Sequence, residues 1–260
     1  MSHLIYLDVH LEQSFVPVKG VGQTTERRLW EAGVTSWDAF GRDLNVHGVG
    51  KTTTDRIESF LAEAPWHLDR RDGRYFEQRL PSSERFRMYE TFRDEAACFD
   101  IETTGLEPAH STVTTLSVHC GDETTTVVRG DNLTADRVAD LLDAPLLVSF
   151  NGRQFDVPFL EHEFDISLDA AHLDLRYPCS SLGLTGGLKR VEADIGIERD
   201  RPDLSGRDAI RLWREYERGD DAALDTLISY NRDDAVNLLA LADEASARLH
   251  DERAGDVLPR

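Results

Sequence analysis

Apolar positions recur with two different periods along the chain, and the change falls near residue 95. Before this point, apolar residues follow helical spacing in 24–32 and 53–64. After it, a short apolar run at 97–102 and Thr- and Val-rich runs at 112–119 and 123–129 predict strands. The last two runs flank Cys120-Gly121-Asp122, which predicts a hairpin. We therefore expect a helical N-terminal part followed by an α/β part.

The α/β part continues as an alternation of helices and strands. Residues 134–142 are amphipathic with Thr134 as the expected N-cap, 146–150 predict a buried strand, 157–164 a helix and 172–175 a last short strand. Residues 188–250 predict helices with breaks near Gly196, 202–206 and 219–220. Hairpin strands, then alternation, then helices predict an α/β fold with a mixed sheet flanked by helices.

The helical part contains one pattern twice. Gly20-Val-Gly22 and Gly48-Val-Gly50 each precede a Thr-containing helical stretch, and Lys51 follows the second pair. Paired glycines permit a tight hairpin that leaves backbone N–H groups free at the next helix start, where anions bind. This repeat resembles the tandem helix-hairpin-helix module, which implies contact with nucleic-acid phosphates through these five residues. A small helical packing domain remains the alternative.

The segment 65–94 between the two parts is charged and contains Pro65, Gly73 and Pro81, so we expect a connector with a short helix at 83–92. Six arginines between residues 70 and 87 make it the most basic stretch, and they indicate either a solvated linker or a path for a nucleic-acid backbone. The predicted organisation is an N-terminal segment (1–12), the hairpin module (13–64), this connector (65–94), the α/β domain (95–250) and a C-terminal tail (251–260).

The composition indicates the salt conditions and the cell compartment in which the protein works. The 260 residues carry a formal net charge of −20, and the only lysines are Lys19, Lys51 and Lys189. This acidic, lysine-poor composition is typical of proteins from halophiles, where high salt screens repulsion between the protein and phosphates. No apolar run is long enough for a membrane span, and residues 1–12 do not resemble a secretory signal. Three isolated cysteines also favour a cytoplasmic location.

Acidic residues at three separated segments supply the candidate chemistry. Asp100 and Glu102 lie two apart on a predicted strand and therefore share a face. Two acids on one buried face are costly unless cations neutralise them, although an acidic strand end at the surface is the simpler alternative.

The second and third segments add further acids. Asp156 follows a Gly-containing turn at the start of a predicted helix, where it can equally be an N-cap. Tyr230 and Asp234 are four apart on a predicted helix and therefore point the same way.

Together these segments resemble the three motifs of the DEDD 3′–5′ exonuclease superfamily, in its tyrosine (DEDDy) subtype. Asp100 and Glu102 match D-x-E; Asn151, Phe155 and Asp156 match N-x-x-x-F-D; Tyr230 and Asp234 match Y-x-x-x-D. The region 95–250 is similar to the YprB-type ribonuclease H-like domain, which also carries the G-L-K-x-V-E segment found at 187–192. The resemblance implies a ribonuclease H-like fold and metal-dependent exonuclease activity.

The resemblance also implies the cofactors and roles. Asp100, Glu102, Asp156 and Asp234 are expected to hold two Mg²⁺ or Mn²⁺ ions, with Tyr230 orienting or helping to deprotonate the attacking water. The expected partner is nucleic acid, with single-stranded or 3′-ended DNA favoured and RNA possible. Contacts to it are expected from residues near the acids, namely Thr103, Thr104, Leu106, Asn151, Phe155, His172 and Lys189. Asp174 is a weaker candidate beside His172.

Two other functions remain open at this point. A non-catalytic nucleic-acid-binding or scaffold protein needs only the hairpin module, and a structure-specific endonuclease uses the same fold. The presence of all four acids argues against the first, and the tyrosine motif argues against the second. Metal-dependent turnover and a circular substrate distinguish them.

Overall fold

The structure is a computed structural model that describes residues 10–41 and 44–258. The chain divides into two compact units, one formed by residues 1–93 and 244–260 and the other by residues 94–243. The predicted N-terminal segment lies mostly outside the described residues. The observed division also groups 65–93 and the C-terminal residues with the hairpin region, whereas we expected a separate connector and tail.

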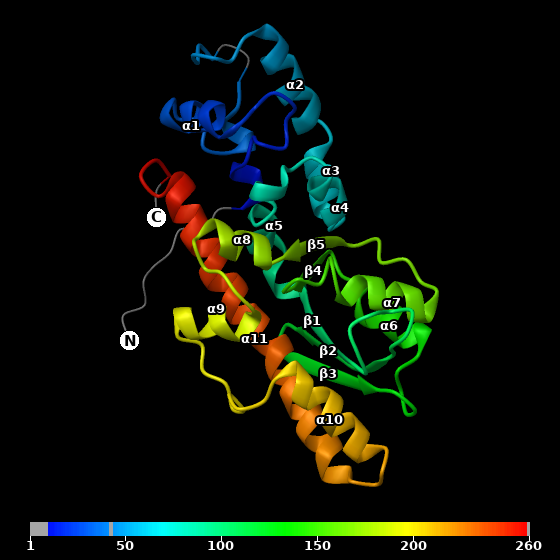
Figure 1. Cartoon of the computed structure of the whole chain (residues 1–260). Helices are drawn as coiled ribbons and strands as arrows, with labels where there is room; N and C mark the ends of the chain where they lie inside the picture. Colours follow the sequence, from blue (N-terminus) through cyan, green and yellow to red (C-terminus); the bar gives the residue numbers. More distant parts are fainter. Residues whose placement is uncertain (1–9, 42–43, 259–260) are drawn as a thin grey trace. The chain divides into compact units, whose positions relative to one another are not determined.

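The first unit is helical (Figure 1). Its elements are η1 (Leu11–Gln13), α1 (Gln23–Glu31), η2 (Trp37–Ala39), α2 (Lys51–Leu61), α3 (Ala64–Asp69), α4 (Gly73–Glu77), η3 (Ser82–Glu84), α5 (Arg87–Phe92) and the end of α11 (Asp221–Ala254). Ala254 and Leu258 pack with Trp30, so the residues expected to form a tail contribute to an apolar cluster instead.

The duplicated sequence pattern forms two equivalent turns. Gly20 and Gly48 have φ values of 94° and 90°, a region that favours glycine. The amide of Val21 donates to the Val18 carbonyl, just as that of Val49 donates to the Val46 carbonyl. Gly22 and Gly50 are the N-caps of α1 and α2. Each copy therefore forms a tight turn followed by a helix.

Each of these turns is also held by an arginine from the other copy. Arg28 on α1 donates from Nη1 to the His47 carbonyl at 3.5 Å. Arg56 on α2 donates from Nη1 to the Lys19 carbonyl at 3.2 Å. Arg28 and Arg56 are equivalent positions in the two copies, so the exchange is reciprocal.

The segment 65–93, predicted to be a connector with one short helix, contains that helix and two more. It forms α3, α4 and α5, and aromatic residues bury it in the first unit; Phe76, Phe86 and Phe92 are 2% exposed or less. Arg87, one of the arginines considered as a path for nucleic acid, is 1% exposed and forms ion pairs with Glu26 at 2.9 Å and Glu84 at 2.7 Å. The charged residues of this segment led to the prediction of a linker, whereas its large aromatic side chains are buried.

The second unit contains the predicted mixed sheet. Its strands are β1 (Ala97–Thr103), β2 (Val113–Cys120), β3 (Glu123–Val128), β4 (Leu146–Ser149) and β5 (Ala171–Asp174), in the order β3-β2-β1-β4-β5. The pairs β1–β2 and β2–β3 are antiparallel, whereas β1–β4 and β4–β5 are parallel. This confirms the predicted fold class, a ribonuclease H-like mixed sheet flanked by helices.

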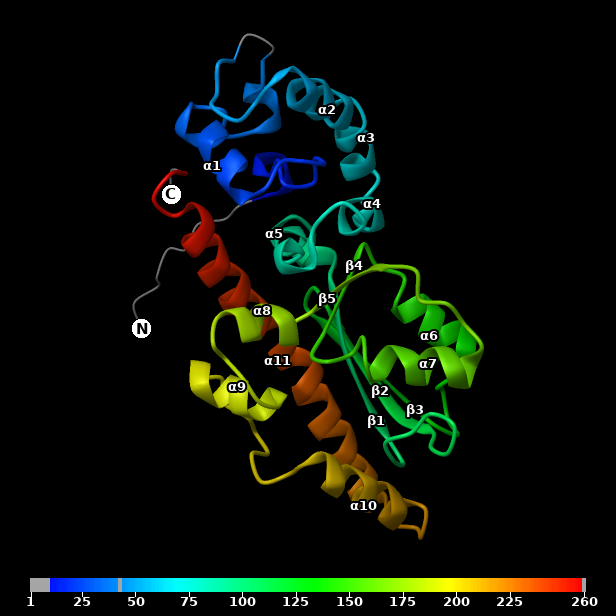
Figure 2. The same ribbon diagram turned by 45° about the horizontal axis from the view of Figure 1, so that its top comes forward.

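Two helices cover one face of this sheet. α6 (Ala135–Leu141) and α7 (Asp156–Phe164) lie side by side over the strands (Figure 2). Their residues Val138, Phe159 and Leu160 pack in one core with Phe99 and Ile101 of β1. Thr134 caps α6 as predicted, because its side chain accepts from the Arg137 amide. Since side chains alternate along a strand, Asp100 and Glu102 belong to the opposite face.

The remaining helices follow the predicted breaks. They are α8 (Arg176–Ser181), α9 (Leu188–Ile195), α10 (Gly206–Tyr216) and α11 (Asp221–Ala254), with the short η4 (Arg93–Glu95) preceding β1. α9 ends at Gly196, whose φ of 84° suits glycine. Leu212 and Trp213 of α10 pack with Leu227 and Tyr230 of α11, which fixes the first turns of the long helix.

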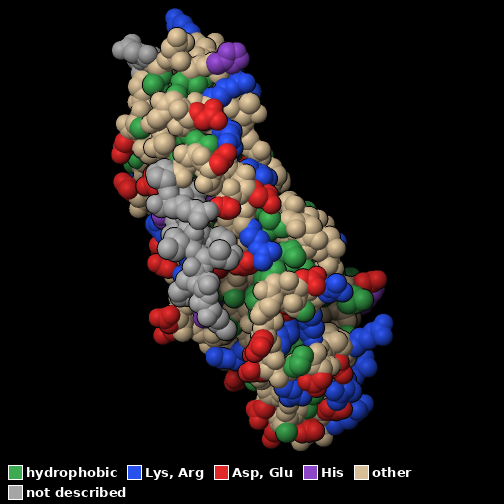
Figure 3. All heavy atoms as spheres, turned by 90° about the vertical axis from the view of Figure 1, so that its left-hand side faces the viewer, with side chains coloured by type: hydrophobic (Ala, Val, Ile, Leu, Met, Phe, Trp, Pro, Cys, Tyr) green, Lys and Arg blue, Asp and Glu red, His purple; other side chains and the backbone are tan. Residues whose placement is uncertain are grey.

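The surface charges, the hydrophobicity of the helices and the cysteines can now be compared with the composition. Acidic and basic side chains are interspersed on the face drawn in Figure 3. Among the residues described, no helix combines the length and hydrophobicity needed to cross a bilayer. Cys98 and Cys179 are buried and Cys120 is exposed, and all three are free thiols.

Candidate active site

The candidate site begins on the central strand β1. Asp100 and Glu102 pair across the antiparallel ladder with Ser117 and Thr115, and the register shifts between Glu102 and Thr103. Such bulges redirect side chains and occur next to active sites. One carboxylate oxygen from each of Asp100, Glu102 and Asp234 lies within 4.8 Å of the others. Three of the four predicted metal ligands therefore converge.

Asp156, the fourth predicted ligand, adjoins β1 from the start of α7. Its Oδ1 accepts from the Ile101 amide at 3.2 Å, and the residue is 5% exposed. The N-cap of α7 is Phe155, so Asp156 does not cap its own helix. Gly152 makes room in the preceding turn, because a Cβ there would lie 2.1 Å from Ser149 Oγ. The sharp turn thus brings the Asp156 carboxylate to the central strand.

Helix α11 supplies the third segment. Tyr230 and Asp234 are both 5% exposed, one turn apart. Asn231 is fully buried, and its Nδ2 donates to the carbonyl of Asp100 at 3.1 Å and to its Oδ2 at 2.8 Å. This amide orients the first predicted ligand. The Tyr-Asn pair was visible in the sequence, but the role of Asn231 was not predicted.

Burial raises the pKa values of all four acids, and repulsion from neighbouring carboxylates adds to this. Desolvation is the largest cause for each, and it raises the pKa values of Asp100 and Glu102 well above their usual range, with further contributions from Asp234 and Asp156. The pKa of Asp156 rises to about 7 and that of Asp234 to about 6. Acids in this state bind protons or cations strongly.

Burial and the same acids raise the pKa of Tyr230 far above its ordinary value. Its phenol therefore keeps its proton at neutral pH. In the metal-free protein this protonation suits a role in orienting a water molecule.

Two cationic side chains adjoin the acids. Arg199, from the segment between α9 and α10, forms ion pairs with Asp234 and with Glu192, and its side chain is 6% exposed. Lys189 on α9 places Nζ 4.9 Å from the centre of the Tyr230 ring. Desolvation and the charge of Arg199 lower the pKa of Lys189. Lys189 was a predicted contact residue, whereas Arg199 lies in a loop without any motif and was missed.

The residues following β1 lie in different settings. Thr103 is 6% exposed, and its hydroxyl donates to the Gly105 carbonyl at 2.5 Å. The Thr104 hydroxyl accepts from the Thr112 amide at 3.0 Å. Leu106, by contrast, is 78% exposed. Of these three predicted contact residues, Leu106 is the one whose side chain is free to meet a substrate.

The predicted residues near β4 and β5 serve mainly local structure. Asn151 has a φ of 67° in the turn after β4, and Phe155 packs on Phe159 with ring centres 4.8 Å apart. His172 is 5% exposed with Nε2 2.7 Å from Ser149 Oγ, so it is a buried core histidine. Asp174 accepts from the amides of Asn151, Arg153 and Arg176. Its oxygens hold the turn in place.

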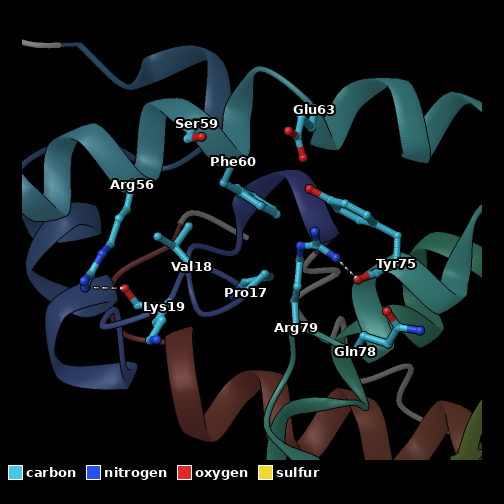
Figure 4. Close-up of a pocket in the computed structure, with 10 residues that line it drawn as sticks. All are labelled: Pro17, Val18, Lys19, Arg56, Ser59, Phe60, Glu63, Tyr75, Gln78 and Arg79. Carbon is cyan, nitrogen blue, oxygen red and sulfur yellow. Dashed lines mark hydrogen bonds between the residues drawn. The ribbon is translucent and has the colours of Figure 1, made fainter.

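The first unit contains a pocket of about 480 Å³ beside the first hairpin turn (Figure 4). Lys19, Arg56 and Arg79 line it, together with one carboxylate, Glu63. Tyr75 is 6% exposed and its hydroxyl has no hydrogen-bond partner among the described residues. The pocket is therefore cationic in a strongly acidic chain.

The donor set of the second unit fits a divalent cation. Carboxylate oxygens are the ligands preferred by Mg²⁺ and Mn²⁺. Asp100, Glu102 and Asp234 offer three such oxygens within 4.8 Å of one another, in a buried position where negative charge needs neutralising. These three residues could hold one ion, and Asp156 adds a neighbouring carboxylate.

Comparison with known proteins agrees with this architecture. Residues 97–246 match the RNase_H superfamily. The chain belongs to this superfamily. The match extends from the first residue of β1 into α11 and so includes every acid of the candidate site. The RNase_H superfamily domain is thus the part of the chain that bears the acid cluster.

Several solved structures are similar to the chain. A family B DNA polymerase from the hyperthermophilic archaeon Pyrobaculum calidifontis is 21% identical, with a TM-score of 0.48 over 57% of this chain and 24% of the polymerase. The Mg²⁺-bound NrnC of Brucella melitensis is 17% identical, with a TM-score of 0.43 over 64% of this chain and 79% of NrnC. At these values the similarity carries no information on activity. No curated protein matches the chain.

Proposed function

We propose that the RNase_H superfamily domain is a divalent-cation-dependent 3′–5′ exonuclease that hydrolyses phosphodiester bonds of nucleic acid, with DNA the favoured substrate and RNA possible. The observation that carries the proposal is the convergence of Asp100, Glu102 and Asp234 within 4.8 Å, with Asp156 alongside. Membership of the superfamily supports a nuclease chemistry. The polarity and the exonuclease mode rest on the resemblance of the three motifs to the DEDDy pattern.

The acids are proposed to hold Mg²⁺ or Mn²⁺, two ions in the full scheme, which supply an activated water and stabilise the leaving 3′-oxygen. Residues of the chain position the metal ligands, the attacking water and the substrate. Asn231 holds the Asp100 carboxylate, and the protonated phenol of Tyr230 orients the attacking water. Lys189 offers a positive charge to a phosphate, because its Nζ has no hydrogen-bond partner among the described residues. Leu106 offers an exposed apolar contact to the terminal base.

The first unit is proposed to bind the nucleic-acid backbone. The amides at the starts of α1 and α2, after Gly22 and Gly50, suit phosphates. Lys51 opens α2 at the surface, and the nearby pocket adds Arg56 and Arg79. These are the charges expected for phosphate contacts that position a strand without reading its sequence.

The test is Mn²⁺-stimulated degradation of a 3′-labelled single strand. Asp100→Ala and Asp234→Asn are expected to abolish it, and a covalently closed circle is expected to stay intact. Undiminished cleavage by either variant would refute the assignment of the site. Cleavage of the circle would instead indicate an endonuclease, and binding without any turnover would indicate a scaffold protein.

A further inference from the structure

Arg199 is the one feature of the site that the proposed scheme does not use. Its Nε donates to Glu192 and its Nη1 donates to Oδ1 of Asp234, while Nη2 has no hydrogen-bond partner among the described residues. The side chain is 6% exposed, and the Glu192 side chain is 1% exposed. A buried guanidinium thus binds one oxygen of a predicted metal ligand.

The charge balance of the site shows what this guanidinium does. The four predicted acids and Glu192 face two cationic side chains, Arg199 and Lys189. Arg199 forms buried ion pairs with Asp234 and with Glu192. It therefore already acts as a counter-ion in the metal-free protein. When all five acids are ionised, the positive charges of Arg199 and Lys189 leave a net charge of −3. One bound divalent ion changes this net charge to −1.

Resting on the proposed function, we propose that Arg199 takes the place of a second cation at Asp234, so that the protein without nucleic acid binds one divalent ion. A second ion then enters only when Arg199 leaves Asp234. One carboxylate oxygen from each of Asp100, Glu102 and Asp234 lies within 4.8 Å of the others, and this group is proposed to hold the first ion.

Glu192 provides the position to which Arg199 withdraws. Its Oε2 already accepts from Arg199, and its Oε1 has no hydrogen-bond partner among the described residues. The guanidinium also has an unused Nη2. A planar guanidinium and a carboxylate readily form two parallel hydrogen bonds. Arg199 can thus exchange its bond to Asp234 for a second bond to Glu192 while it stays buried.

The experiment is calorimetric titration of the full chain with Mn²⁺ in the absence of nucleic acid, combined with thermal unfolding. The wild type is expected to bind one ion. Arg199→Gln, which removes the charge, is expected to bind two, with an affinity for the first raised about tenfold or more, because a unit charge a few ångströms away acts strongly at an effective dielectric of about 20. Its melting temperature without metal is expected to fall and to recover with Mn²⁺.

Two further variants serve as a control and as an independent test. Arg211→Gln on α10 is the matched control, because Arg211 also pairs with a carboxylate, that of Glu215, but its side chain is 52% exposed. It is expected to behave as the wild type. Glu192→Gln removes the position to which Arg199 withdraws and is expected to weaken Mn²⁺ binding, the opposite direction to Arg199→Gln.

The outcomes separate the two proposals. Wild type that binds no Mn²⁺ would contradict the metal site of the proposed function itself. Wild type that binds two equivalent ions, or an Arg199→Gln protein with unchanged stoichiometry and affinity, would overturn only the role of Arg199. If Arg199→Gln does not fold even with Mn²⁺, Glu192→Gln decides, because tighter binding there would equally overturn the inference.

Discussion

Replacing Asp156 by Asn is expected to stabilise the metal-free protein while it impairs metal binding. Asn has the same shape and keeps an oxygen to accept from the Ile101 amide. What it removes is a buried negative charge, which desolvation and the neighbouring Asp174 and Asp234 disfavour. The native carboxylate is therefore retained at a cost in stability, as is typical of functional sites.

The magnitude follows from the pKa of Asp156, which burial raises from 3.8 to about 7. Above pH 7 this difference corresponds to about 4 kcal/mol at most. A gain of about 2 kcal/mol, after the cost of burying an amide, raises the melting temperature by about 4–8 °C for a protein of this size. The folded state binds the extra proton between about pH 4 and pH 7, so the gain is present at pH 8 and shrinks as the pH falls towards 4.

The assay is thermal unfolding with EDTA at pH 8 and at pH 5, followed by Mn²⁺ addition at pH 8. Asp225→Asn on α11 is the control, because Asp225 is an exposed acid of the same unit. It is expected to leave the melting temperature nearly unchanged at both pH values. An Asp156→Asn protein that melts at or below the wild type at pH 8 would refute the reasoning from burial and charge.

Four other outcomes are expected. Asn231→Ala removes a hydrogen bond to the Asp100 carboxylate, of about 1.5–3 kcal/mol, and should weaken Mn²⁺ binding in a calorimetric titration. Tyr230→Phe should lower kcat about tenfold, less than the 10²–10⁴ typical of a general acid or base, since the phenol orients water and keeps its proton. The affinity for Mn²⁺ should rise between pH 5 and pH 8, because Asp234, whose pKa is about 6, must lose its proton when the ion binds. The released proton can be measured by calorimetry in buffers of different ionisation enthalpy. Arg56→Ala should reduce the salt dependence of DNA binding by about one unit of slope, with cleavage of a dinucleotide unchanged. An unchanged Mn²⁺ affinity in Asn231→Ala, an unchanged kcat in Tyr230→Phe, a Mn²⁺ affinity independent of pH, or an unchanged salt dependence in Arg56→Ala would contradict the role proposed for that residue.

The strands of the sheet and the shared faces of the acids could be predicted from the sequence because both follow from short-range periodicity. That the acids of the three segments meet was implied by the resemblance to the exonuclease motifs. The two-residue repeat places Asp100 and Glu102 on one face of β1, and the four-residue helical spacing aligns Tyr230 with Asp234. A threonine before an amphipathic stretch predicted the cap of α6 correctly. These features depend on backbone geometry that neighbouring residues determine.

The parts that were missed depend on contacts between distant segments. Arg199 lies in a loop, and no local pattern indicates that its guanidinium meets Glu192 and Asp234. The segment 65–93 looks like a linker by its charge and prolines, but Phe76 and Phe92 bury it. His172 at a strand end suggested a contact to nucleic acid, whereas its side chain is buried beside Ser149. Tertiary burial decided each of these cases.

The reciprocal arginines of the two hairpin turns have a consequence for how this region can be divided. Arg28 reaches the carbonyl of His47, and Arg56 reaches that of Lys19, so each copy completes the other. A fragment cut between the two copies loses both hydrogen bonds at once. Transplanting the region to another protein, or shortening it, must keep residues 15–61 together. The duplicated region therefore has to stay whole to keep both hydrogen bonds, although its sequence contains two copies of one pattern.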